Sequence, residues 1–249
     1  MLILTILLLS IPFASQAYSQ QPSGGSAGKD TQLSTVDQIL DKYVEALGGR
    51  AAIEKIKSSR VKGTVEIPAA GVAGTVEFLR KAPNMVLTSV TVNDSVVGRT
   101  AFDGNAGWSE NIRDGVKALT GEDLIDARTQ ADFYISVRLR QLYPKMVLDG
   151  LEKDGDSEAY VIEATPENGR PVTFHFDKSS GLLVRTDSVV VNQEGQSHST
   201  VYFADYRDVD GVKTPCLIRG VTPLSTIIFK LTDIRNNIEI DGSKFVMPK

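Results

Sequence analysis

The order of apolar and polar positions divides the chain into an apolar leader, a polar stretch and a long patterned segment. Leu2 to Phe13 form an almost continuous apolar run, and the small residues Ser15 and Ala17 follow at the spacing of a signal peptidase site. This pattern predicts a signal peptide over 1–17, cut after Ala17. No Lys or Arg precedes Lys29, so an uncleaved anchor stays open as an alternative, although the run is shorter than the ~20 residues of a spanning helix.

Residues 18–33 have no apolar periodicity and are rich in Gly, Ser and Gln, which predicts a flexible linker. The segment 24–28 matches the G-x-S-x-G sequence of a hydrolase nucleophile. That motif requires a strand before the serine and a helix after it. The flanking sequence predicts neither element, so we interpret this segment as part of the linker.

From Ser34 the apolar positions follow a helical period. Ser34 is the expected N-cap, with Asp37 as its capping-box partner, and Gly48 ends the helix. A second short helix is expected over 51–57. A later helical stretch runs from the N-cap Thr120 to Pro144, and its expected apolar stripe is Leu124, Ala131, Ile135, Leu139 and Leu142.

After Ser58 the period changes from 3.6 to 2. Val61, Val65 and Ile67 alternate with polar residues, which is typical of a half-buried strand. Similar segments recur to Asp233, and short turns with Asn or Asp before Gly separate them, so neighbouring strands must be antiparallel. The pattern predicts an α+β fold: a strongly curved antiparallel sheet of about eleven strands, a half-open β-barrel, with helices covering its concave face. We expect a single domain over 34–249.

Composition is that of an ordinary globular protein, with 41% hydrophobic and 23% charged residues. The net charge is −4 and the basic residues are scattered, so nucleic acid is not an expected partner. The single cysteine, Cys216, is expected to be a small buried side chain. The two histidines, His175 and His198, are expected to face solvent.

These residues supply neither a metal-ligand set nor a pair of nucleophile and base, so we predict no metal, no cofactor and no catalytic residue. The carboxylates of Asp205, Asp208 and Asp210 do not have the spacing of a calcium loop and are expected in a polar hairpin. An unrecognised hydrolase is the least favoured function class.

Several longer segments resemble the bacterial outer-membrane lipoprotein-sorting-like proteins. The resemblance lies in 36–49, the turn 102–108, the hairpin 176–183, the hairpin 205–215 and the closing 245–248, and it extends over 34–249. It implies the fold of the periplasmic lipoprotein carrier of the Lol system, an open β-barrel with a helical lid that binds acyl chains. The motifs consist mostly of turn and strand residues, so they are more specific for the fold than for the cargo.

The favoured function is therefore a non-enzymatic carrier or sensor, periplasmic or secreted, that binds a lipid, an acyl chain or another apolar ligand. The alternative is a protein-interaction or structural module that docks to a larger exported complex through an envelope protein partner. In the first case the ligand is expected between sheet and helices, with Arg138 at the lip favouring an anionic head group. The predicted lining residues are Val65, Phe78, Leu87, Trp108, Ile135, Leu139, Leu142, Phe174 and Phe229.

Overall fold

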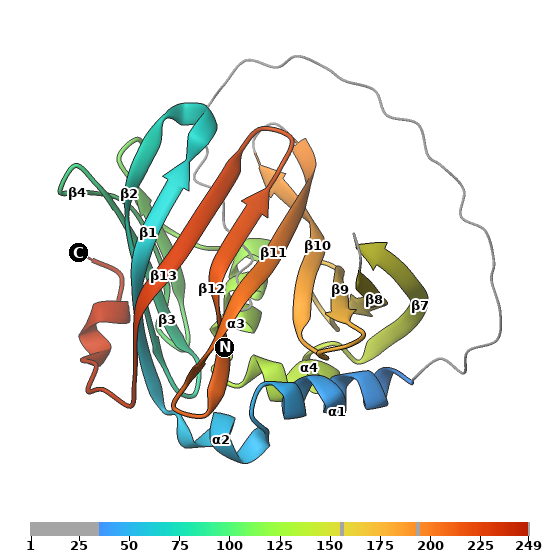
Figure 1. Cartoon of the computed structure of the whole chain (residues 1–249). Coiled ribbons are helices and arrows are strands. Elements are labelled where there is room, and N and C mark those ends of the chain that lie inside the picture. Colours follow the sequence, from blue (N-terminus) through green and yellow to red (C-terminus); the bar gives the residue numbers. More distant parts are fainter. Residues whose placement is uncertain (1–34, 155–156, 193–194, 249) are drawn as a thin grey trace.

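The computed structural model describes residues 35–154, 157–192 and 195–248 (Figure 1). The predicted signal peptide and linker lie outside the described residues, as does the G-x-S-x-G segment. The described chain forms one antiparallel sheet of thirteen strands with four helices and two short 3-10 turns.

The strands follow one another along the sheet in the order β6-β5-β4-β3-β2-β1-β13-β12-β11-β10-β9-β8-β7. Two meanders, β1 to β6 and β7 to β13, are therefore joined by the pairing of β1 with β13. The strands are β1 (Ser58–Ile67), β2 (Val72–Lys81), β3 (Met85–Val92), β4 (Ser95–Phe102), β5 (Gly107–Asn111), β6 (Gly115–Ala118), β7 (Lys145–Asp154), β8 (Ser157–Thr165), β9 (Val172–Asp177), β10 (Leu183–Asn192), β11 (Gly195–Val209), β12 (Val212–Val221) and β13 (Thr226–Asn236).

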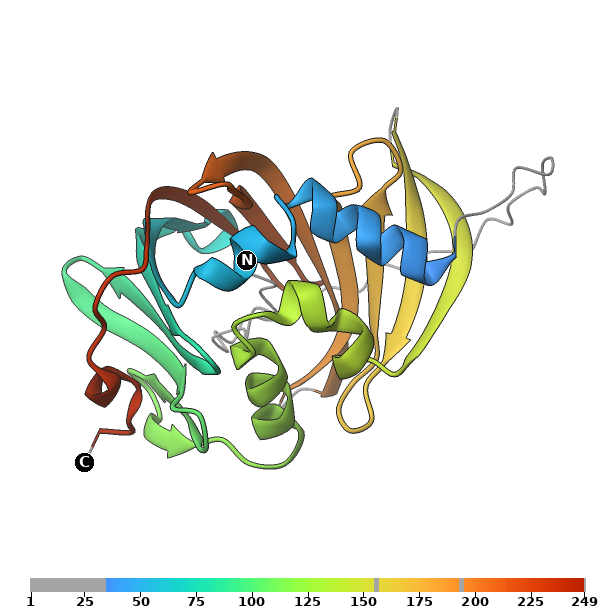
Figure 2. The same cartoon turned by 90° about the horizontal axis from the view of Figure 1, so that it is seen from below.

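The sheet curves into an unclosed bowl, with the unpaired edges at β6 and β7, and its concave side holds the helices (Figures 1 and 2). This confirms the predicted α+β half-open barrel. The strand number is slightly higher than expected, partly because the four residues of β6 are too few to show an alternation. The helical elements are α1 (Val36–Ala46), α2 (Arg50–Lys55), α3 (Gly121–Ala131), α4 (Ile135–Leu142), η1 (Pro68–Ala70) and η2 (Gly242–Phe245).

Two details of the helices differ from the sequence prediction. The N-cap of α1 is Thr35, and Gln38 rather than Asp37 completes its capping box. The stripe expected to run through 124–142 is broken into α3 and α4, because the Asp132 carboxylate accepts a hydrogen bond from the Tyr134 backbone N–H at 2.9 Å and turns the chain. The resulting helices have separate faces.

Apolar residues collect in two clusters on opposite sides of the sheet. The larger cluster fills the concave side, where side chains from the strands meet α1, α2 and α4. The smaller lies on the outer face of β2 to β5, under the C-terminal segment that contains η2. Adjacent strand residues point to opposite faces, so Phe78 belongs to the first cluster and Leu79 to the second.

Candidate functional site: the concave core and its helical cover

Six of the predicted lining residues meet in the concave core. Four come from strands and two from α4, and each is at most 4% exposed: Val65, Phe78, Ile135, Leu139, Phe174 and Phe229. The Phe78 and Phe229 rings lie 5.9 Å apart at an edge-to-face angle, and Phe174 packs in the same manner on Tyr143. Leu142 is partly buried at the margin of this core.

Leu87 and Trp108 do not belong to this core. The structure places both in the smaller cluster on the outer face, so they do not line a concave cavity with the other predicted residues. The Trp108 indole N–H donates a hydrogen bond to the Phe245 carbonyl at 2.7 Å, which fastens the C-terminal segment to β5. Trp108 is buried, as expected of a core residue, but on the other side of the sheet.

Arg138 lies within α4 and reaches back to the α3–α4 junction, with 44% of its side chain exposed. Its guanidinium pairs with the Asp132 carboxylate and donates to the Gln141 side-chain oxygen at 3.0 Å. These contacts stabilise the turn between the two helices, and the pocket next to this junction is lined by another arginine.

That arginine is Arg80, on the concave face near the end of β2. It is 5% exposed, and its Nη2 donates to the backbone carbonyls of Gln130 at 3.1 Å and Asp132 at 2.8 Å. Burial lowers the pKa of Arg80 to about 10, and nearby Asp132 opposes this effect. Arg80 thus ties the C-terminal end of α3 to the sheet. The sequence analysis did not single out Arg80. Its position two residues after Phe78 was the available signal, because it places both side chains on the same face of the strand.

A small pocket adjoins Arg80 between α2 and strands β1, β12 and β13. Its volume is about 30 Å³, and its apolar walls include Ile53, Ile56, Phe133 and Leu231. Sites for drug-sized ligands occupy roughly 300–1,000 Å³. The pocket is therefore far too small for an acyl chain unless the helices move.

The other end of α3 is held by Arg170, in the loop between β8 and β9. Arg170 contacts three carboxylates of the helix: Asp126 at 2.7 Å, Glu122 at 3.0 Å and Asp123 at 3.1 Å. Burial on its own would lower the pKa of Arg170, but the hydrogen bonds and charges of these carboxylates outweigh it and raise the pKa. Only 15% of the Arg170 side chain is exposed, so its ion pairs are less accessible to water than ordinary surface ion pairs are.

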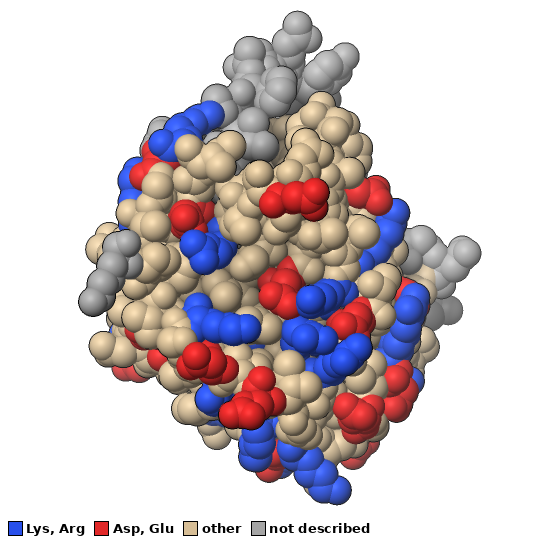
Figure 3. Space-filling view, turned by 90° about the vertical axis from the view of Figure 1, so that its left-hand side faces the viewer, with Lys and Arg blue, Asp and Glu red and all other residues tan. Residues whose placement is uncertain are grey.

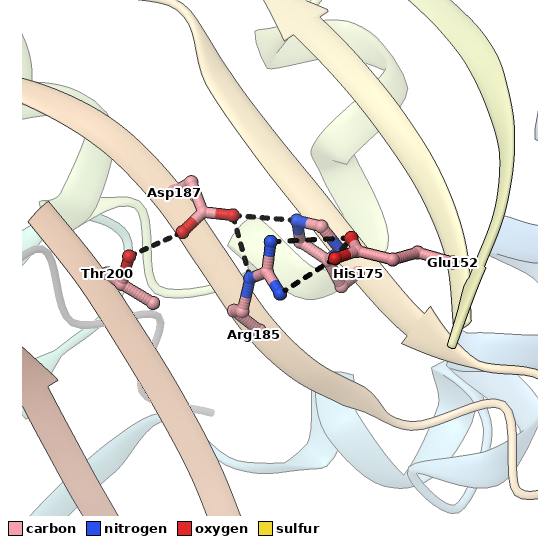
Figure 4. Close-up of polar contacts among 5 residues, drawn as sticks. All are labelled: Glu152, His175, Arg185, Asp187 and Thr200. Atoms are coloured by element: carbon pink, nitrogen blue, oxygen red, sulfur yellow. Dashed lines mark hydrogen bonds and ion pairs between the residues drawn. The ribbon is translucent and has the colours of Figure 1, made fainter. Parts of the chain in front are cut away.

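A second polar group, the outer polar cluster, lies on the opposite face of the sheet and consists of Glu152, His175, Arg185, Asp187 and Thr200 (Figure 4). The prediction that His175 faces solvent is wrong, because the residue is only 3% exposed. Its Nε2 lies 2.8 Å from the Asp187 carboxylate and its Nδ1 lies 3.3 Å from that of Glu152.

Asp187 is the centre of the outer polar cluster. It also contacts Arg185 at 2.8 Å and accepts a hydrogen bond from the Thr200 hydroxyl at 2.6 Å. Although burial acts in the opposite direction, the bonds from His175, Thr200 and Arg185 hold its pKa well below the usual range. The cluster joins β7, β9, β10 and β11 across the outer face.

The structure places His198, Cys216 and the aspartates of the 205–210 hairpin as the sequence predicts. His198 is exposed and Cys216 is buried. Asp208 accepts a hydrogen bond from the Gly211 backbone N–H in the β11–β12 turn, and Asp205 pairs with Arg207, as expected of a polar hairpin. Within the described ranges, no helix combines the length and the apolar character needed to cross a membrane.

Comparison of the sequence with known proteins finds no matching family profile and no matching curated protein. Comparison of the structure finds clear neighbours. A DUF1329 family protein from Desulfovibrio piger has a TM-score of 0.60 at 15% identity and covers 85% of this chain and 97% of its own.

A LolA superfamily protein from Nitrosomonas europaea has a TM-score of 0.57 at 16% identity, and the match covers 86% of this chain and 98% of that protein. An outer membrane lipoprotein-sorting protein domain from Vibrio parahaemolyticus has a TM-score of 0.57 at 14% identity. The match covers 85% of this chain and 97% of that domain. At these identities the similarity is one of fold. The chain has the fold shared by the LolA superfamily, lipoprotein-sorting domain and DUF1329 proteins, which confirms the fold that the sequence resemblance implied.

Proposed function

We propose that the protein is a carrier or sensor that binds an apolar ligand, such as the acyl chain of a lipid or lipoprotein, in its concave core. The observation that carries the proposal is the way α3 lies across the open side of the bowl (Figure 2), beside a core to which α1, α2 and α4 contribute side chains and α3 contributes none. Only Ala131 of its eleven residues is buried, whereas four of the eight residues of α4 are buried. Polar contacts at its two ends, through Arg80 and Arg170, hold α3 in place.

A cover attached in this way can move without unfolding the sheet. As α3 moves outward, Arg80 and Arg170 lose their partners on the helix but become open to water, which replaces the lost hydrogen bonds. An acyl chain entering beneath α3 gains about 0.8 kcal/mol for each methylene that leaves water. A chain of moderate length would thus offset the cost of displacing a helix with little buried surface.

The structure corresponds to the closed form in this scheme. The apolar side chains of the concave core are packed on one another, and the pocket beside Arg80 has only about 30 Å³. Ligand binding would therefore move the α3–α4 segment outward. The proposed site lies in the cell envelope, as the predicted signal peptide implies, with a lipid or an envelope protein as partner and no catalytic residue.

Binding is tested with a fluorescent fatty acid and by organic extraction of lipid from the purified chain. We expect saturable binding that Leu139→Glu abolishes, because the variant puts a charge into the apolar core. Gln141→Glu adds the same charge on the exposed side of α4 and should bind normally. Leu142→Glu, at the core margin, provides a second variant if Leu139→Glu does not fold.

Circular dichroism and thermal unfolding identify the folded variants. If folded Leu139→Glu and Leu142→Glu both bound the fatty acid like the unaltered chain, the concave core would serve packing alone. The protein-interaction module would then be the better interpretation.

A further inference from the structure

Four hairpin tips lie side by side at one end of the sheet. They are the connections β1–β2, β3–β4, β5–β6 and β12–β13, at residues 68–71, 93–94, 112–114 and 222–225. Successive strands run in opposite directions and β1 pairs antiparallel with β13, so all four connections fall on the same end. In the strand order they are consecutive, and we call these tips with their flanking residues the hairpin rim.

Large apolar side chains are exposed along the hairpin rim. Ile112 is 82% exposed, Val96 50% and Leu224 45%, one on each of three tips. The fourth tip exposes Pro68 and Ala69. Singly exposed apolar residues are common, but large ones on three of four consecutive tips are grouped rather than scattered.

The opposite end of the same strands has a different composition. Its described turns include 103–106 and 210–211, which consist of Asp, Gly, Asn and Ala, and the helices α1 and α2 lie at that end (Figure 1). Among the described residues, the other large apolar side chains with comparable exposure are Val147 on β7 and Val246 and Met247 near the C-terminus. Three of the six exposed large apolar side chains in the described part of the chain thus lie on the hairpin rim.

Charges of both signs occur near the rim: Asp94 and Arg113 are exposed on its tips, and two further pairs lie close by. Lys117 lies 3.3 Å from Asp114, and Lys230 lies 2.9 Å from Glu66 below the β1–β2 and β12–β13 tips. On the side of the molecule that carries β1 to β4, acidic and basic residues are interspersed and neither sign dominates (Figure 3). This surface has no charged patch that would select an acidic or a basic partner protein.

We propose that the hairpin rim docks on the surface of a lipid bilayer, with its apolar tips in the head-group layer. Neighbouring tips are ~10 Å apart, twice the spacing of paired strands. Such a spaced row of single side chains offers no groove for a protein segment, whereas a fluid head-group layer accommodates each tip separately. The inference rests on the proposed function, because a carrier of acyl chains must meet the membrane that supplies or receives them.

The test is co-sedimentation of the purified chain with phosphatidylcholine vesicles. We expect weak binding that changes little between low and high salt, because the rim has no excess charge. Ile112→Ser should lower the partition coefficient about fivefold, and adding Leu224→Ser should lower it about fivefold again, since each removes apolar surface from the bilayer. Both side chains are exposed, so the variants should fold.

Val147→Ser is the matched control, because Val147 is 62% exposed on the edge strand β7. It should bind vesicles like the unaltered chain. Failure of the unaltered chain to bind vesicles, or an equal loss in the control, would overturn the rim assignment. A dimer in sedimentation velocity that Ile112→Ser dissociates, without vesicle binding, would assign the rim to a second copy and also overturn it.

Fatty-acid binding is measured on the same samples to separate the two proposals. The rim variants should retain it, because the rim lies outside the concave core. Vesicle binding without fatty-acid binding would support the rim proposal and overturn the carrier function. Fatty-acid binding without vesicle binding would support the carrier function and overturn the rim proposal.

Discussion

A few charged side chains that are wholly or partly removed from solvent connect different elements: Arg80 is buried and Asp187 is partly buried. Arg80 links β2 to the end of α3, while Asp187 gathers contacts from three neighbouring side chains on the outer face. A buried charge is costly unless it is paired, so removing one partner leaves the other without compensation. Substitutions at these positions are therefore expected to lower the stability of the fold.

The lowered pKa of Asp187 predicts a specific dependence of stability on pH. The depressed value means that the ionised carboxylate stabilises the folded state above the unfolded pKa, about 3.9, and that this contribution is lost as the pH falls below it. We expect Asp187→Asn to destabilise the protein by about 2 kcal/mol at pH 7 and less at pH 3. Urea unfolding across this range measures the difference, and a variant curve parallel to the wild-type curve would contradict it.

At the scale of elements, α3 on the concave side and the C-terminal segment on the outer face are each held to the sheet by a few side-chain contacts. The N-terminal turn of α3 carries Glu122 and Asp123, which suit the positive end of the helix dipole and also pair with Arg170. The C-terminal segment packs Phe245 onto Trp108 on the outer face. Each attachment can be loosened separately.

Replacing Arg170 with Gln leaves three neighbouring carboxylates without their shared cation. We expect α3 amides to exchange with solvent about tenfold faster or more while the amides of β11 and β12 are unaffected, since a loss of ~1.4 kcal/mol in local stability is a factor of ten. Hydrogen exchange by mass spectrometry measures this. Arg128→Gln, on the exposed side of the same helix, is the control, and equal exchange in both variants would rule out the link through Arg170.

Phe245→Ala tests the attachment of the C-terminal segment. Phe245 is fully buried, so the change should cost about 3 kcal/mol in unfolding free energy. The chain has one tryptophan, so its emission should shift to longer wavelength as the cover over Trp108 loosens. Val246→Ala, at an exposed neighbour, should leave the emission unchanged, and an unshifted spectrum in Phe245→Ala would contradict the contact.

At the scale of the whole molecule, the predicted signal peptide and linker precede a single curved sheet. The predicted cleavage after Ala17 implies that the exported protein begins near Tyr18. Intact-mass analysis of the protein from the envelope fraction tests this. An intact Met1 in the membrane fraction would instead favour the anchor.

Much of this architecture was predictable from the strand alternation, because apolar residues recur at every second position in most of the strands. Alternation is lost in part of β3, where Met85, Val86 and Leu87 are all apolar, so it could not tell which side Leu87 occupies. Trp108 was assigned to the wrong side for a related reason, since the C-terminal segment that covers it is remote in sequence. His175 was misplaced because its cover comes from charged side chains of neighbouring strands.

The pairing of β1 with β13 also has a consequence for how the chain folds. Every other pair in the described sheet joins strands that follow each other in sequence, but β1 meets its second partner, β13, only after almost the entire domain has been made. Such non-local contacts raise the contact order and place folding in the slow range of milliseconds to seconds. Until then one edge of β1 has unpaired backbone groups, so the nascent chain is exposed to strand-to-strand aggregation along it.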